Sequence, residues 1–157
     1  MRNVSGAQLC AALLSVLLVV PVQAEQIEEI IVSADFRQRG SADVPASITV
    51  FDAEQIRQRS VQHFEELVYS VPNLNWSGDG NRARYFQIRG AGELEQYQGA
   101  PNPSVGFLID DIDFSGIGTV ATLFDMEQIE VLRGPQGTRY GANALAGLIY
   151  MRSTLPK

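Results

Sequence analysis

The chain has 157 residues, which is enough for one domain and short of two. With 45% hydrophobic and 19% charged residues, it is typical of a globular protein, and an intrinsically disordered chain is excluded. The net charge of −6 disfavours general nucleic-acid binding, because phosphate neutralisation needs clustered cations. One Cys and one His exclude an intramolecular disulfide and most metal-ligand sets.

Residues 1–24 have the pattern of a secretory signal peptide. Arg2 gives a weakly positive start, residues 9–20 form an apolar run, and Val22 and Ala24 offer small side chains to a signal peptidase. The run is shorter than the roughly 20 apolar residues of a membrane span, so an uncleaved anchor is the less favoured alternative. Cleavage would remove the only Cys, and a mature chain without thiols suits an extracytoplasmic compartment.

Residues 25–43 are predicted to form an extended, mostly unpacked leader in front of a domain at 44–157. The leader opens with acidic residues, continues with the apolar run 30–32 and then becomes polar. The domain is expected to begin with a β-strand at 47–51, because residues alternate there and β-branched side chains are frequent.

Two short helices are predicted after this strand. Asp52 can cap the first one, with Gln55 as its capping-box partner. The second is expected to start near Ser60 and to end at Pro72, because the residue before proline avoids helical geometry. Its apolar residues recur at helical spacing and are Val61, Phe64, Leu67, Val68 and Val71.

The rest of the chain alternates short strands with long polar loops. Strands are expected at 85–89, 105–109, 112–114, 129–132 and 148–151. Loops and turns are expected at 73–84, 92–103, 110–111, 116–118 and 133–137, with one helical turn after Asp125. This pattern predicts an α+β fold: a small mixed sheet of four to five strands with short helices and long polar loops.

No catalytic or metal-binding pattern stands out. The glycine-rich stretch 134–147 matches neither a dinucleotide-binding fingerprint nor a P-loop. Residues 111–116 imitate the start of a calcium loop, but its twelfth position is Thr122 and not a bidentate Glu. His63 lies off the apolar stripe and is expected to be a solvated surface residue, so a nucleophilic triad lacks parts. We expect no enzyme, no bound metal and no cofactor.

Residues 129–141, IEVLRGPQGTRYG, resemble the most recognisable segment of the plug domain of TonB-dependent outer-membrane receptors. Four further motifs occur in the family's order: VPASITV at 44–50, FEELVYSVPNL at 64–74, FQIRG at 86–90 and VGFLID at 105–110. Because the motifs keep this order behind a signal peptide, the resemblance is specific, and it covers essentially the whole mature chain.

The resemblance implies a plug motif whose residues contact the wall of a surrounding barrel. The residues concerned are Arg89, Gly90, Arg133, Gly134, Pro135, Gly137 and Gly141. Arg side chains suit this role because they can pair with carboxylates in a bidentate manner. For any single Arg, a solvated or internally paired charge is the alternative.

Residues 28–34, EEIIVSA, resemble the TonB box, the short segment that the inner-membrane protein TonB grips. A common form of the box ends in V-T-A, and here Ser33 replaces Thr. The resemblance implies that TonB binds Glu29, Ile30, Ile31, Val32, Ser33 and Ala34. A flexible β-branched peptide can add as a strand to a partner's sheet edge through backbone hydrogen bonds. An ordinary first strand of the domain is the alternative.

The resemblance also implies that three loops, 76–81, 96–103 and 115–119, face an external ligand. The contact candidates are Trp76, Asn81, Tyr97 and Gln98. An aromatic side chain on a polar loop can stack on a ligand. A partly buried hydrophobic anchor is the alternative for such a residue.

In function, the resemblance implies a gate that closes a 22-stranded barrel. The plug would face the periplasm from the outer membrane and serve the uptake of a scarce nutrient such as an iron–siderophore complex, another metal chelate, a vitamin or a glycan. Asp110-Asp111 departs from the family's usual Asp-Gly, and no barrel sequence follows the plug. A piece of a longer receptor, a truncated gene and a free-standing plug all remain open. The alternative function is a free-standing periplasmic ligand-binding or adaptor domain.

Overall fold

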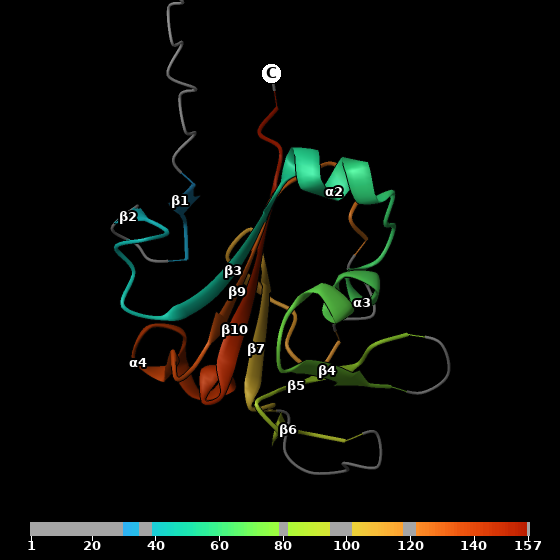
Figure 1. The fold of residues 1–157 in the computed structure, drawn as a ribbon. Helices are drawn as coiled ribbons and strands as arrows, with labels where there is room; N and C mark the ends of the chain where they lie inside the picture. The colour runs from blue at the N-terminus through green and yellow to red at the C-terminus, as the bar shows by residue number, and fades with distance from the viewer. Residues whose placement is uncertain (1–29, 35–38, 79–81, 95–101, 118–121, 157) are drawn as a thin grey trace, which may run out of the picture.

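The computed structural model describes residues 30–34, 39–78, 82–94, 102–117 and 122–156 (Figure 1). The strands are β1 (Ile31–Val32), β2 (Arg39–Gly40), β3 (Ser47–Asp52), β4 (Leu74–Ser77), β5 (Tyr85–Ile88), β6 (Ala91–Gly92), β7 (Val105–Ile109), β8 (Ile112–Asp113), β9 (Met126–Arg133) and β10 (Gly147–Ser153). The helices are α2 (Ala53–Arg59), α3 (Phe64–Leu67), η1 (Val68–Ser70), α4 (Gly137–Tyr140) and η3 (Gly141–Ala144). Within the described ranges, no helix has the length and apolarity needed to cross a membrane.

The central sheet has five strands in the order β3-β9-β10-β7-β8. β9 pairs antiparallel with both β3 and β10, while β10 pairs in parallel with β7. The sheet is therefore mixed, and together with the short helices it confirms the predicted α+β fold.

One face of this sheet carries the main hydrophobic core. Side chains alternate along a strand, so Ile129, Val131, Ile149 and Met151 all point to the same side, where they are fully buried. α2 and α3 cover this face (Figure 1). The ring of Phe64 in α3 lies edge-on to those of Phe86 and Phe107, with centroid distances of 5.3 and 5.7 Å.

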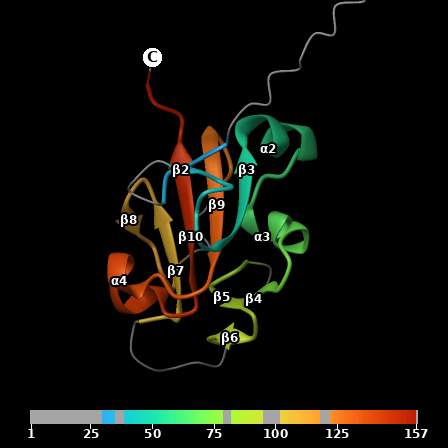
Figure 2. The same ribbon diagram turned by 60° about the vertical axis from the view of Figure 1, so that its left-hand side comes forward.

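The opposite face of the sheet carries a second cluster of buried residues. Its members are Ala34, Leu108, Leu132, Ala144, Leu148 and Tyr150. β1 and β2 cross this face and α4 lies beside it, on the side away from α2 and α3 (Figure 2). The leader predicted to be mostly unpacked is therefore packed where the structure describes it, which corrects that expectation.

A second, three-stranded sheet in the order β4-β5-β6 lies at the end of the molecule opposite the C-terminus (Figure 1). β4 occupies part of the predicted 73–84 loop, so that prediction was wrong over residues 74–77. Leu74 is buried there and pairs with Ile88, while Trp76 pairs with Phe86. The strand is short and its neighbours are polar, which hid it in the sequence.

The first predicted helix is confirmed, and the second is shorter than expected. The carboxylate of Asp52 accepts a hydrogen bond from the Gln55 amide at 2.7 Å and so caps α2. The second helix begins only at Phe64, because Gln62 instead bonds Leu123 through its carbonyl and His63 forms a bridge with Thr122.

The helical turn predicted after Asp125 was also wrong. Asp125 is left-handed, with φ of 58°, and β9 begins at the next residue. Its carbonyl accepts a hydrogen bond from the Thr154 amide at 2.9 Å, beyond the end of β10. The backbone therefore continues the antiparallel pairing in place of a helix.

The Asp110-Asp111 pair forms the tight turn between β7 and β8 without glycine. Both residues are left-handed, with φ of 49° and 67°. The Asp110 carboxylate accepts hydrogen bonds from the amide and hydroxyl of Ser153 at 2.8 and 2.7 Å. Asp111 accepts one from the Tyr150 hydroxyl at 2.9 Å, and burial together with this carboxylate raises the pKa of Tyr150. These bonds offset the strain of the departure from Asp-Gly.

Candidate functional site

Residues 30–34, called here the box segment, form a short strand with one paired edge. β1 pairs antiparallel with β2, with Ile31 opposite Gly40. The Ile30 carbonyl accepts a hydrogen bond from the Ser41 amide at 2.8 Å, on the same edge. The side chains of Val32 and Ala34 are fully buried, whereas Ile31 is 49% exposed. The segment is thus an integral part of the described fold.

The other edge of the box segment faces β9 and is bound by side chains. The Glu130 carboxylate accepts hydrogen bonds from the amides of Ser33 at 2.5 Å and Ala34 at 2.8 Å. The Gln128 amide group donates to the Ile31 carbonyl at 2.7 Å. Because an edge strand leaves its own backbone groups open, these side chains satisfy groups that a neighbouring strand would otherwise bind.

Two further side chains hold the end of the segment. The Tyr140 hydroxyl, from α4, donates to the Ala34 carbonyl at 2.8 Å. The guanidinium of Arg152 donates to the Ser33 hydroxyl and lies 3.1 Å from the carboxylate of Glu127. The polar cluster of Gln128, Glu130, Tyr140 and Arg152 therefore contacts three of the five residues of the segment.

Glu130 is the most buried member of this polar cluster, with 1% of its surface exposed. Burial raises the pKa of Glu130 above its ordinary value, and the amides of Ala34 and Ser33 and the charge of Arg152 oppose that shift. A buried carboxylate is costly unless its oxygens are bonded. The carboxylate and the box segment therefore depend on each other: the segment buries Glu130 and also supplies its donors.

Sequence reasoning identified the box segment but missed the polar cluster that binds it. A signal existed in the alternation of β9, because Glu130 lies two residues before the buried Leu132 and so shares its face. That spacing could have marked Glu130 as a buried acid in need of donors. Glu29, the first predicted residue of the box, lies outside the described residues.

The predicted plug motif lies at the far end of β9 and around α4. Arg133 is half-buried and donates from its guanidinium to the Pro72 carbonyl at 3.2 Å. Gly134 has φ of 142°, and its amide bonds the Ala146 carbonyl at 3.1 Å. The exposed Pro135, Gly137 and Gly141 follow along the surface. Contact of these residues with a barrel stays a prediction.

The other predicted Arg-Gly pair turns the chain between β5 and β6. Arg89 and Gly90 are both exposed and both left-handed, with φ of 55° and 80°. The Arg89 amide bonds the Asn73 carbonyl at 2.8 Å, which ties this turn to the start of β4. The Arg89 side chain is thereby placed at the surface, where a barrel contact remains a prediction.

Of the four ligand-contact candidates, only Trp76 lies among the described residues. Asn81, Tyr97 and Gln98 fall outside them. Trp76 is half-buried in β4 and packs against the main core. A contact of Trp76 with a ligand therefore stays a prediction, and its observed environment is that of a partly buried anchor.

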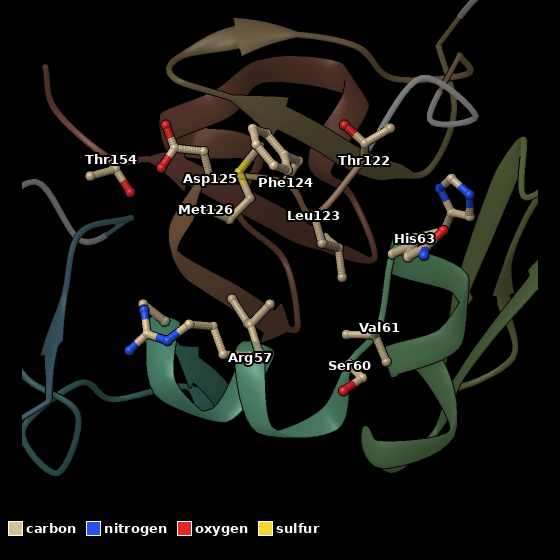
Figure 3. A pocket seen from close by; sticks show the side chains of 13 residues that line it. Arg57, Ser60, Val61, His63, Thr122, Leu123, Phe124, Asp125, Met126 and Thr154 are labelled. Carbon is tan, nitrogen blue, oxygen red and sulfur yellow. The ribbon is translucent and has the colours of Figure 1, made fainter.

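A surface groove of about 640 Å³ lies between α2 and residues 122–126 (Figure 3). Ile56, Val61 and Leu123 line it, and Phe124 beside them is 87% exposed. His63 borders the groove; it is half-buried, and its ring lies 3.3 Å from the Arg82 guanidinium, so it is less solvated than predicted. Sequence reasoning did not find this groove, because its two walls come from distant parts of the chain.

Comparison with known proteins identifies the family. The family model described as TonB-dependent Receptor Plug Domain matches residues 41–148. The pesticin receptor of Yersinia enterocolitica is 30% identical over 135 residues, which cover 85% of this chain and 20% of that protein. The chain thus spans about one fifth of the length of this curated relative.

Solved structures agree with this assignment. The ferric yersiniabactin uptake receptor FyuA of Yersinia pestis is 31% identical with a TM-score of 0.59, over 71% of this chain and 17% of that one. The ferric-catecholate import receptor Fiu of Escherichia coli K12 is 30% identical with a TM-score of 0.56, over 76% of this chain and 16% of that one. The chain therefore belongs to the TonB-dependent receptor plug domain family.

Proposed function

We propose that this chain is the plug, or gate, of an outer-membrane receptor for the active uptake of a scarce nutrient such as an iron–siderophore complex. The observation that carries the proposal is the family match over residues 41–148, immediately behind a box segment that lies on the same sheet. The relatives FyuA and Fiu are named as receptors for ferric yersiniabactin and ferric catecholates, which supports an iron chelate as the ligand class.

In this proposal the plug has two working ends. β4, β5 and β6 lie at the end away from the C-terminus and lead to the predicted ligand loops (Figure 1). The box segment lies on the other part of the molecule, across the central sheet, and presents residues 29–34 to TonB. A 22-stranded barrel surrounds the plug, and transport follows from displacement or partial unfolding of the plug when TonB pulls. The plug binds and moves; it catalyses no bond chemistry.

The mass and location of the native polypeptide test this proposal. An antibody against residues 52–74 is used on fractionated source cells. A band of roughly 70–100 kDa in the outer membrane is expected, because a plug with a 22-stranded barrel and its loops has about that mass. A soluble periplasmic band close to the mass of this chain, 17.2 kDa, would contradict the receptor and favour a free-standing binding or adaptor domain.

A further inference from the structure

The two edges of β1 differ in what satisfies their backbone groups. N–H and C=O groups point to opposite sides at successive residues of a strand. Ile30 directs its carbonyl toward β2, where it accepts from Ser41. Ile31 and Ser33 are therefore expected to direct their groups away from β2, and their hydrogen bonds to Gln128 and Glu130 agree with this.

Gln128 and Glu130 reproduce the hydrogen-bonding pattern of a strand. Gln128 offers a donor to the Ile31 carbonyl, and Glu130 offers an acceptor to the Ser33 amide. The two residues are separated by one position on β9, as Ile31 and Ser33 are on β1, so the spacings along the two strands match. Gln128 also donates to Glu130 at 2.7 Å, which links the two groups.

We propose that the edge of β1 facing β9 is the surface to which a strand of TonB pairs, and that Gln128 and Glu130 occupy this edge in the closed plug as a substitute for that strand. The proposal rests on the proposed function, since it assumes that TonB is the partner. An unpaired strand edge is the usual site for an added strand. On β1 this is the only edge left without a backbone partner among the described residues.

The consequence is a competition for two backbone groups. TonB can pair with Ile31 and Ser33 only after Gln128 and Glu130 have let go of them. The apparent affinity for TonB then equals the intrinsic affinity reduced by the fraction of molecules with a free edge. Gln128 and Glu130 are therefore positioning residues that weaken TonB binding in the closed plug.

Two substitutions remove the substitute strand in different ways. Glu130→Gln leaves a single acceptor oxygen where two amides, those of Ser33 and Ala34, now bond to a carboxylate. Gln128→Leu removes the donor to Ile31 at a half-buried position, where the fold tolerates the change more easily. Glu66→Gln is the matched control, because Glu66 is an exposed acid of α3 that has no contact with the box segment.

The test compares the full chain and these variants for binding to the purified periplasmic domain of TonB, with hydrogen exchange of the Ser33 and Ala34 amides as a second readout. We expect Glu130→Gln and Gln128→Leu to bind about tenfold more tightly and to exchange these amides faster. Glu66→Gln should match the unmodified chain.

The possible failures are distinguishable. If the unmodified chain binds TonB but both variants bind equally or more weakly while their amides exchange faster, TonB does not use this edge and the inference is overturned. If neither the unmodified chain nor any variant binds TonB, the proposed function itself fails.

Discussion

Ser33 and Glu130 are 97 positions apart, yet the Ser33 amide donates to the Glu130 carboxylate at 2.5 Å. This bond joins the segment proposed to bind TonB to the strand that carries the family's most recognisable motif. A pull on the box segment would therefore act directly on β9, the strand that pairs with both β3 and β10 in the central sheet.

The buried Glu130 predicts a pH dependence of stability. Because burial raises its pKa, the folded chain holds more protons than the unfolded chain between the ordinary and the raised value. The contribution of Glu130 to the free energy of unfolding is therefore full at pH values below the ordinary pKa and is lost as the pH rises through the raised one. Urea unfolding of the unmodified chain and of Glu130→Gln across pH 4 to 7 measures this. The difference between the two curves should change over that window, and two parallel curves would contradict the prediction.

Phe64 is predicted to be a major contributor to the core. It is fully buried and its ring contacts those of Phe86 and Phe107. Phe64→Ala should lower the free energy of unfolding by about 3–5 kcal/mol, through lost burial and a cavity. Tyr69→Ala, at a side chain that is 89% exposed, is the control and should change it by about 0.5 kcal/mol or less. Similar losses for the two variants would argue against the described core.

Gly147 is predicted to be intolerant of any side chain. A Cβ atom there would lie 2.5 Å from the Leu132 carbonyl oxygen and 2.6 Å from a methyl group of Ile88. Gly147→Ala should therefore lower the free energy of unfolding by about 1–3 kcal/mol, as overpacking does. At Gly137 a Cβ atom would meet nothing within 4 Å, so Gly137→Ala should be close to neutral. Thermal melts of the two variants compare them, and equal melting temperatures would show that β9 and β10 can separate without cost.

Much of the central sheet was predictable from the sequence. The strands around Val50, Phe107, Val131 and Ile149 were found because β-branched and apolar residues alternate there or run together between turn signals. The cap at Asp52 was found from residue type and spacing alone. β4 was missed because only two of its four residues, Leu74 and Trp76, are apolar.

The environment of the box segment was not predictable in the same way. Its residues were found through a resemblance, but the sequence does not show that they pack on β9. That packing depends on contacts of Ser33 and Ala34 with Glu130, which are far apart in the chain. Local patterns report which residues of a strand share a face, and they do not report what covers that face.

The most direct test of the account is binding of the TonB periplasmic domain to two variants at one position. Ser33→Pro removes the amide that the added strand would bond, whereas Ser33→Ala keeps it and removes only the hydroxyl. The account predicts that the unmodified chain and Ser33→Ala bind TonB and that Ser33→Pro does not. Binding of Ser33→Pro with the affinity of Ser33→Ala would contradict it.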